Sequence, residues 1–252
     1  MKFKTILLLS GDISLNPGPP QLNQMWSPFC NKGAHFIHLN INSLLCKIDE
    51  LRHIAKNTNA AVIGISESKL DDSIYDSEIC IENYEILRND RNRHGGGVAC
   101  YIRKDISFNV LNIFEEEIEN ICISILLPKT KPFTVAIFYR PPTHNHFLEK
   151  IATGLSQFGT DDKEVYILGD LNINLLYNGK YTLENKKNIR INDSTLHYKN
   201  QQYQDFCKTF SLKQLIRSPT RVTCNSSLLI DHILTNSPAK ISKSGIIDIS
   251  IS

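Results

Sequence analysis

Long hydrophobic runs are missing from this sequence. The apolar run near the N-terminus, Ile6–Leu9, is shorter than the core of a secretory signal and far shorter than a membrane span. Basic residues precede it, so a weak targeting signal stays open as an alternative. We therefore expect no membrane partner for this chain.

Closely spaced cysteine pairs are missing as well. The seven cysteines are an odd number, and none of them forms a Cys-x-x-Cys pair. This spacing argues against a zinc cage and against a disulfide framework. The pattern is typical of a reducing compartment, so we expect a nuclear or cytoplasmic location.

An excess of either charge is also absent. The net charge is +2 and the isoelectric point is about 8.1, so total charge does not identify a nucleic-acid-binding protein. Any such binding has to come from local patches. The 252 residues, of which 41% are hydrophobic, suit one or two domains and suffice for a single core without disulfides.

The first 34 residues differ from the rest of the chain. Residues 1–34 contain several prolines, among them Pro17 and Pro19, and have little periodicity, which predicts a flexible leader. From His35 onward apolar runs alternate with turn signals. We therefore expect one folded domain at residues 35–252.

Apolar patterns place the elements of this domain. Ser43 can cap a helix whose apolar face carries Leu44, Ile48 and Leu51. Residues 176–198 are polar and predict a loop. Further helices are predicted at 147–158 and 203–210, and strands at 35–41, 60–65, 98–103, 122–127, 134–139, 165–168, 228–234 and 246–251. Strands that are apolar on both faces, separated by a few helices, predict an α/β sandwich.

Single polar residues stand at the ends of several of these strands. They are Asn40, Glu67, Tyr139 with Arg140, Asp170 with Asn172, and Asp231. Polar groups at strand ends can converge on one rim of a sheet. A carboxylate beside amide oxygens suits Mg²⁺, which in turn suits phosphoryl chemistry. The pattern thus indicates a metal-dependent hydrolase.

Each of these residues also has a plainer interpretation. Asn40 suits a turn, Glu67 suits a helix cap or a surface charge, and Asp170 after Gly169 suits a simple turn. Asp231 is harder to explain in this way, because a buried carboxylate needs a partner. Taken one at a time, the residues do not identify a substrate.

Six short motifs nevertheless occur in a recognisable order. They are Leu-Asn-Ile-Asn-Ser-Leu (39–44), Ile-Ser-Glu-Ser (65–68), Gly-Gly-Gly-Val (95–98), Phe-Tyr-Arg-Pro-Pro (138–142), Gly-Asp-Leu-Asn (169–172) and Ile-Asp-His-Ile (230–233). Together they resemble the endonuclease/exonuclease/phosphatase superfamily with its DNase I-like fold, and within it the endonuclease domains of LINE-type non-LTR retrotransposons. Residues 214–223 resemble a segment that such elements carry before Ile-Asp-His-Ile.

The resemblance covers about residues 35–252 and implies both a fold and an activity. The fold would be a four-layer α/β (α+β) sandwich of two packed, mostly antiparallel β-sheets flanked by helices. The activity would be Mg²⁺-dependent hydrolysis of a DNA phosphodiester, which leaves a 3′ hydroxyl that primes reverse transcription, with Mn²⁺ as an alternative cofactor. DNA would be the partner, a reverse transcriptase domain would follow downstream, and the domain would act as a monomer.

The resemblance also implies a role for each motif residue. Glu67 would be the metal ligand, with Asn40 assisting at the same site. Tyr139 would hydrogen-bond the scissile phosphate, and Asp170 would position or activate the attacking water. Asn172 would help to hold the phosphate. The role implied for Asp231 is to orient a catalytic histidine.

Several arginines are candidates for contact with DNA. Arg140 follows Tyr139 directly, and the cluster of Arg88, Arg91 and Arg93 lies beside the triple glycine. These side chains could contact the backbone of the nucleic acid. A solvated loop is the competing interpretation of the cluster.

The catalytic histidine itself is expected in a Ser-Asp-His motif after the strand at 246–251, and the printed sequence ends at Ser252. His232 does not replace it, because on a strand it points to the face opposite Asp231. We therefore expect a domain that lacks its final Asp-His segment, with the last sheet strand lost and an edge or gap in its place. Loss of one member of a concerted catalytic set costs several powers of ten, so an inactive remnant with weak DNA binding is the alternative function.

A second resemblance lies in the leader. Residues 11–19 resemble a 2A-type ribosome-skipping peptide, in which the product would begin at Pro19. Ser14 stands where that pattern has glutamate, and a proline-rich turn is the alternative. A different member of the superfamily, a phosphatase or an RNA nuclease, is a third functional hypothesis.

Overall fold

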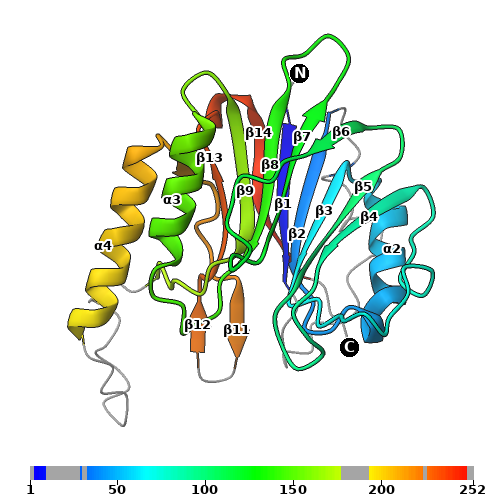
Figure 1. Cartoon of the computed structure of the whole chain (residues 1–252), viewed down its shortest axis with the longest axis horizontal. Helices are drawn as coiled ribbons and strands as arrows, with labels where there is room; N and C mark the ends of the chain where they lie inside the picture. The colour runs from blue at the N-terminus through cyan, green and yellow to red at the C-terminus, as the bar shows by residue number, and fades with distance from the viewer. Residues whose placement is uncertain (1–2, 10–28, 30–32, 177–192, 224–225, 249–252) are drawn as a thin grey trace.

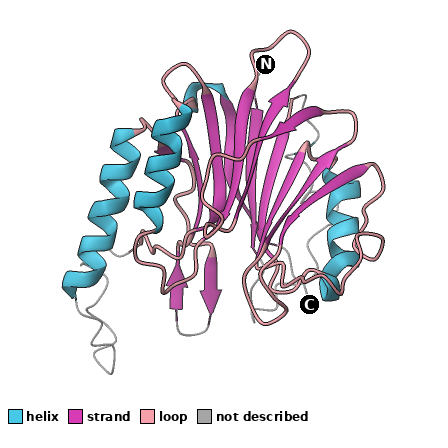
Figure 2. Cartoon of the chain, in the orientation of Figure 1, coloured by secondary structure: helices cyan, strands magenta, loops and turns pink. Residues whose placement is uncertain are grey.

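The computed structural model in Figure 1 describes residues 3–9, 29, 33–176, 193–223 and 226–248. Two β-sheets lie face to face in the middle of the molecule, and the described helices cover their outer faces (Figure 2). This arrangement confirms the predicted four-layer sandwich. The part of the chain that the structure describes contains no helix long and apolar enough to cross a membrane.

The first sheet has the strand order β14-β1-β2-β3-β5-β4. Its strands are β1 (Phe3–Leu9), β2 (His35–Asn40), β3 (Val62–Ser66), β4 (Tyr84–Asn89), β5 (Val98–Arg103) and β14 (Ile241–Asp248). The pairings from β14 through β1 and β2 to β3 are parallel, and β3-β5-β4 is antiparallel. This sheet is therefore mixed, with more parallel pairing than the sequence predicts.

The second sheet has the order β10-β13-β9-β8-β7-β6, and only β8 and β9 pair in parallel. Its strands are β6 (Ser107–Val110), β7 (Asn120–Leu126), β8 (Phe133–Tyr139), β9 (Glu164–Asp170), β10 (Lys213–Gln214) and β13 (Asp231–Thr235). A separate two-stranded ribbon, β11 (Arg221–Thr223) with β12 (Ser226–Leu228), projects from one end of the sandwich (Figure 1).

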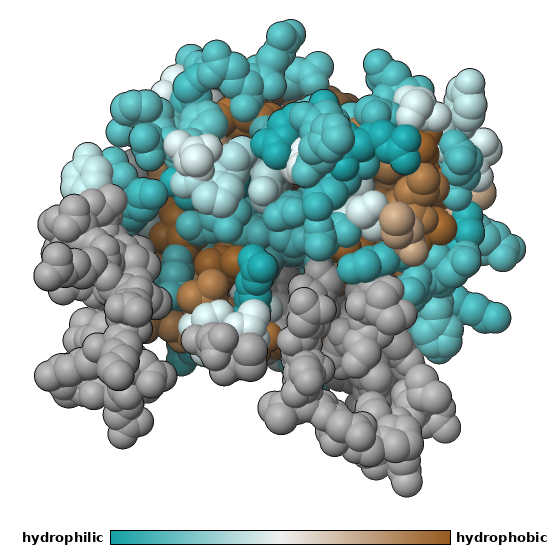
Figure 3. Space-filling model, turned by 90° about the horizontal axis from the view of Figure 1, so that it is seen from below, coloured by the Kyte–Doolittle hydropathy of each residue, from teal (hydrophilic) through white to brown (hydrophobic). Residues whose placement is uncertain are grey.

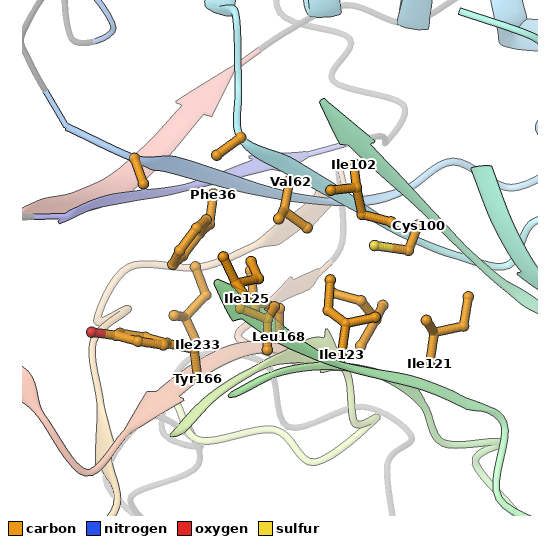
Figure 4. Packing of buried hydrophobic residues seen from close by; sticks show 14 of the residues in the cluster. Phe36, Val62, Cys100, Ile102, Ile121, Ile123, Ile125, Tyr166, Leu168 and Ile233 are labelled. Carbon is orange, nitrogen blue, oxygen red and sulfur yellow. The ribbon is translucent and has the colours of Figure 1, made fainter. Parts of the chain in front are cut away.

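The two sheets are held together by apolar side chains that point inward from both of them (Figure 4). Phe36, Val62 and Cys100 come from the first sheet, and Ile123 and Leu168 come from the second; each is at most 1% exposed. Gly64 in β3 lets the sheets approach closely, since a Cβ atom there would lie 2.5 Å from Cδ1 of Ile137. Burial of this shared apolar surface is the main stabilising contribution of the core.

Helices cover the outer faces of the two sheets. After the short 3-10 turn η2 (Leu45–Lys47), α2 (Ile48–Thr58) packs its apolar stripe on the first sheet. The helices α3 (Phe147–Phe158) and α4 (Asp193–Thr209) cover the second sheet. Another 3-10 turn, η3 (Pro238–Lys240), leads from β13 into β14.

Several sequence predictions need correction. Residues 3–9 form a strand between β14 and β2, so this part of the predicted flexible leader belongs to the sheet, and no gap separates these two strands. Ser43 does not cap α2, because α2 begins after Lys47 without a side-chain cap. The helix predicted at 203–210 begins at Asp193, inside the predicted polar loop. The 2A-like segment, residues 11–19, lies outside the described residues.

Candidate active site

The polar residues at the strand ends meet at one end of the sandwich, the lower end in Figure 1. Asn40 is the last residue of β2 and pairs with Ser66, the last residue of the neighbouring strand β3. Glu67 comes directly after β3 and therefore lies at the same end of the sheet. In the second sheet Tyr139 pairs with Asp170, and Asp170 pairs with Asp231. Figure 3 views the molecule from this end and shows hydrophilic side chains over the middle of the face.

The Asn40 amide links the carboxylates of the two sheets. Its Nδ2 donates to Oδ2 of Asp170 at 2.8 Å and lies 3.3 Å from Oε1 of Glu67. The hydroxyl of Tyr139 also lies 3.3 Å from that Glu67 oxygen. Four of the predicted residues therefore form one hydrogen-bonded group. The Asn40 nitrogen faces the carboxylates, so in this arrangement Asn40 orients Glu67 and Asp170.

Asp170 is the buried carboxylate of the group. Burial raises its pKa to about 6, and the negative charge of Glu67 acts in the same direction. The backbone N–H of Asn172, at 2.9 Å, and the amide of Asn40 act in the opposite direction, because both donate to the ionised form. Burial and the same two carboxylates raise the pKa of Tyr139, so its hydroxyl stays a hydrogen-bond donor. The group therefore carries concentrated negative charge.

Glu67 is held by a strained loop. It has a φ of 53°, and its carbonyl accepts a hydrogen bond from the Ser43 N–H. The next two residues, Ser68 and Lys69, donate their N–H groups to the carbonyls of Gly97 and Gly96. Strained backbone of this kind persists where the surroundings determine it, commonly at functional sites.

The triple glycine lets its own loop lie against Ser68. A Cβ atom on Gly97 would lie 2.5 Å from the Ser68 hydroxyl oxygen, and the φ of Gly97 is 79°. The Gly97 N–H donates to Glu119, whose carboxylate also accepts from Arg91 at 2.9 Å. The Arg91 guanidinium lies 5.8 Å from the centre of the Tyr139 ring, which places it beside the hydrogen-bonded group. Arg91 is also exposed to solvent.

The other candidate arginines have different places. Arg93 is exposed on the same loop. Arg88 is occupied, since it donates to Asp76 at 2.8 Å and to the carbonyl of Ile74 at 2.7 Å. Arg140 is 3% exposed and donates to the carbonyls of Leu171 and Asn172. The guanidinium of Arg140, which the sequence predicts to bind substrate, is thus buried and holds the loop after β9.

Asn172 completes that loop. Its φ is 49°, and its amide Nδ2 donates to the carbonyl of Arg140 at 2.8 Å. The two residues thus exchange hydrogen bonds across the ends of β8 and β9. The exchange fixes Asp170 between them.

Asp231 faces a histidine that belongs to β2. Its Oδ1 lies 3.8 Å from Nδ1 of His38, which is too long for a hydrogen bond. Among the described residues neither ring nitrogen of His38 has a hydrogen-bond partner. Burial lowers the pKa of His38 to about 3, while burial and the nearby Asp170 raise the pKa of Asp231 well above its ordinary value. The pair is therefore buried beside the site without a direct hydrogen bond.

His232 points away from Asp231, as the sequence predicts. Its Nε2 donates to the carbonyl of Ile173 at 2.9 Å, and its Nδ1 accepts from the Tyr203 hydroxyl at 2.7 Å. Burial lowers its pKa to about 4. This histidine is a satisfied core residue.

Sequence reasoning missed four residues beside the group. His38 had a signal, since strand alternation places it on the face of Asn40. Lys69 lies 4.0 Å from Glu67, two residues along the chain. Arg221 is exposed, and its charge acts on both buried aspartates. Glu119 gave no signal, because it ends an ordinary acidic run.

The donor set fits a hard divalent cation. Among the described residues no group of three histidine, cysteine, aspartate or glutamate side chains could hold a metal ion. Mg²⁺ does not require such a cage, since it is held by one or two carboxylates and keeps water or binds substrate phosphate. Glu67 and Asp170 supply two carboxylates on either side of one amide. Burial is the main cause of the raised pKa of Asp170, and the negative charge of Glu67, which a cation would offset, raises it further.

Comparisons with known proteins bear on the fold and on the family of this chain. The structure is similar to the endonuclease domain of TRAS1, a telomere-specific non-LTR retrotransposon (TM-score 0.57, 14% identity, 79% of this chain and 83% of that chain). It is also similar to AP endonuclease LMAP from Leishmania major (0.60, 12%, 88% and 89%) and to the 3′ phosphatase NExo from Neisseria bound to product DNA hairpin (0.54, 13%, 81% and 86%).

At these identities the likeness shows the DNase I-like fold alone. No curated protein matches the chain in sequence. The model of the Endonuclease/Exonuclease/phosphatase family, however, matches residues 37–252. The chain therefore belongs to the Endonuclease/Exonuclease/phosphatase family.

Proposed function

We propose that this chain is a Mg²⁺-dependent DNA endonuclease domain of the non-LTR retrotransposon type. The observation that carries the proposal is the Asn40 amide, which joins Glu67 from one sheet to Asp170 from the other beside the Tyr139 hydroxyl. Family membership restricts the chemistry to nucleases and phosphatases. The likeness to the TRAS1 endonuclease domain and to a phosphatase bound to DNA supports DNA as the substrate class.

Glu67 would hold the cation, and Asn40 would fix the orientation of its carboxylate. Bound Mg²⁺ or Mn²⁺ would supply positive charge to the phosphate oxygens and to the departing oxygen. Tyr139 donates from a hydroxyl that burial keeps protonated, which suits a phosphate oxygen. Asp170 would hold a water by hydrogen bonding, in an orientation fixed by Asn40 and Asn172.

The exposed arginines would bind the DNA backbone. Arg91 stands beside Tyr139, while Arg93 and Arg221 lie on exposed segments nearby. Such contacts position a duplex without reading its sequence. In a full-length element the product would prime a downstream reverse transcriptase. We propose a monomer that acts in the nucleus or the cytoplasm.

A second candidate function is DNA and metal binding without turnover. The observation in its favour is the burial of both histidines on either side of Asp231. His38 and His232 have pKa values of about 3 and about 4 and are fully enclosed. At neutral pH both side chains are therefore neutral and shielded from solvent, so neither suits a proton-transfer role at the site.

A plasmid-nicking assay separates the two functions. Two samples are compared with Mg²⁺: the 252-residue chain and the same chain extended by a terminal strand with Ser-Asp-His from such an element. We expect nicking by the extended chain at least about a thousandfold faster than by the 252-residue chain, because a catalytic histidine acts as a unit with its partners. Glu67→Gln in the extended chain should abolish nicking, and Glu85→Gln, an exposed glutamate on β4, should not.

The outcomes are distinct. Nicking by the extended chain that depends on Mg²⁺ and on Glu67 supports the endonuclease. If the extended chain binds DNA and the cation but leaves the plasmid intact, the second candidate is correct. If nicking persists in Glu67→Gln, the assigned metal ligand is wrong.

A further inference from the structure

Strand β1 occupies an unusual position in the first sheet. It lies between β14 and β2 and pairs in parallel with both of them (Figure 1). On one side Lys4–Leu8 pair with His35–Leu39, and on the other side the strand pairs along its whole length with Ile241–Asp248. A short segment from one end of the chain therefore bridges two strands that are far apart in sequence.

The attachment of β14 to this sheet depends on β1. In the sheet order β14 has β1 as its sole neighbour, and β1 is what joins it to β2. Without β1 both β14 and β2 would present unpaired backbone N–H and C=O groups along a slot one strand wide. The side chains of β14 already contribute to both faces, because Ile246 packs on the core between the sheets and Ile247 packs on the outer cluster.

No short connection holds β1 in place. Parallel pairing rules out a hairpin to either neighbour, and residues 10–34 lie between β1 and β2. An extended chain spans about 3.3 Å per residue, so residues 10–34 reach well beyond the length of the strand. The strand can thus leave the slot while the covalent connection stays intact, and its return is like the binding of a tethered ligand.

The sequence of the segment suits this position. Phe3–Leu9 reads Phe-Lys-Thr-Ile-Leu-Leu-Leu, which is apolar over its second half. Near-continuous apolar runs are typical of inner parallel strands that are covered on both faces. The chemistry that the slot requires is a parallel, extended, apolar peptide with free backbone N–H groups.

We propose that the position between β2 and β14 is a strand-binding site. This chain's own Phe3–Leu9 segment occupies the site reversibly and can be replaced there by another peptide. Any peptide with that chemistry then competes with β1 for the slot. The inference is independent of the nuclease function, because it rests on strand pairing alone.

The experiment uses the folded 252-residue chain with a protease site inserted between Gly18 and Pro19. After cleavage we expect the N-terminal fragment to co-elute with the remainder in size-exclusion chromatography. A fluorescent peptide of residues 2–10, added in excess, should then displace the fragment and bind with an affinity at least about tenfold higher than to the uncleaved chain, since the tether no longer raises the local concentration of β1.

Two matched peptides test the mode of binding. Ile6→Val keeps the backbone donors and should bind as the parent peptide does. Ile6→Pro should not bind detectably, because proline removes an N–H from the ladder. Hydrogen exchange should show the amides of β2 and β14 losing protection when the cleaved fragment is removed and no peptide takes its place.

Three results would overturn the proposal. One is a cleaved fragment that separates with no change in the protection of β2 and β14. Another is equal binding of the Ile6→Val and Ile6→Pro peptides. The third is an uncleaved chain that elutes as a dimer and that the peptide converts to monomer, which would assign the slot to the strand of a second copy.

Discussion

Glu67, which we propose as the metal ligand, has an unfavourable backbone conformation. Its φ of 53° is one of several positive values at the strand ends, together with Asn42, Ser43, Lys69 and Asn172. A residue with a Cβ atom in this region costs about 1–3 kcal/mol, and glycine avoids the cost. The candidate site therefore contains backbone strain at several strand ends.

Substitution at Glu67 should show this strain. Both Glu67→Gly and Glu67→Ala remove the carboxylate, and we expect the glycine variant to be more stable than the alanine variant by about 1 kcal/mol. Urea unfolding in metal-free buffer measures the difference. At Glu85, inside strand β4, the order should reverse, since glycine in a regular strand is the less stable choice. If the glycine variant is the more stable one at Glu85 as well, the difference at Glu67 does not come from backbone strain.

Asp170 should make the metal-free protein less stable as pH rises. Its folded-state pKa of about 6 lies above the ordinary 3.8, so the folded protein binds the proton more tightly than the unfolded chain does. The stability from this group is complete below about pH 4 and is lost as pH rises to about 6.

Asp170→Asn removes this dependence. In chelator at pH 7 we expect the variant to exceed the wild type by about 1–3 kcal/mol in unfolding free energy, and to differ little from it at pH 4. Urea titrations across this range give both values. A constant difference between the two proteins from pH 4 to pH 7 would show that Asp170 is not the group that titrates.

At the scale of the elements, two glycines set how closely strands approach near the site. Gly169 pairs with Phe138 between β8 and β9, and a Cβ atom there would lie 2.2 Å from the Phe138 carbonyl oxygen. Gly64 faces the side chain of Ile137 across the sheets. One contact is with backbone and the other is with the end of a side chain, so the two positions should respond differently.

We expect Gly64→Ala to cost about 1–2 kcal/mol and Ile137→Val to recover a large part of it, because valine lacks the Cδ1 atom that the new methyl meets. A double-mutant cycle by denaturant unfolding measures the recovery. Gly169→Ala should cost more, about 3 kcal/mol, and Ile137→Val should not rescue it. If Ile137→Val restores the stability of the Gly64→Ala and Gly169→Ala variants equally, the two sheets adjust as a whole and the contact with Ile137 is not specific to Gly64.

Elements with strong local patterns were predictable from the sequence. The strand Val98–Arg103 and the helix Phe147–Phe158 were located to the residue, because apolar runs and periodicity mark them. Strand β4 was missed, since only Tyr84 of its residues is buried and the apolar signal is weak. Strand β1 was missed because its pairing depends on β14 and β2, which are distant in sequence.

The same distinction applies to the candidate site. Asn40, Glu67, Tyr139 and Asp170 were identified from their positions at strand ends, and the structure places them in one group. The burial of Arg140 and the position of Asp231 beside His38 depend on contacts between segments far apart in the chain. No local pattern carries that information.

At the scale of the whole molecule, the site exists because the two sheets pack. Asn40 and Glu67 come from the first sheet, while Tyr139, Asp170 and Asp231 come from the second. The cation that we propose between them would bind the folded state and not the unfolded chain. Its binding should therefore stabilise the fold by about 2.7 kcal/mol at a hundred times its dissociation constant.

A titration of the purified chain with Mn²⁺, followed by electron paramagnetic resonance of the free ion, tests the central claim most directly. The account predicts one site that Mg²⁺ competes for, that is lost in Glu67→Gln and that is kept in Glu85→Gln. Absence of binding by the wild-type chain, or equal binding by Glu67→Gln, would contradict the assignment of the Asn40, Glu67 and Asp170 group as a metal centre.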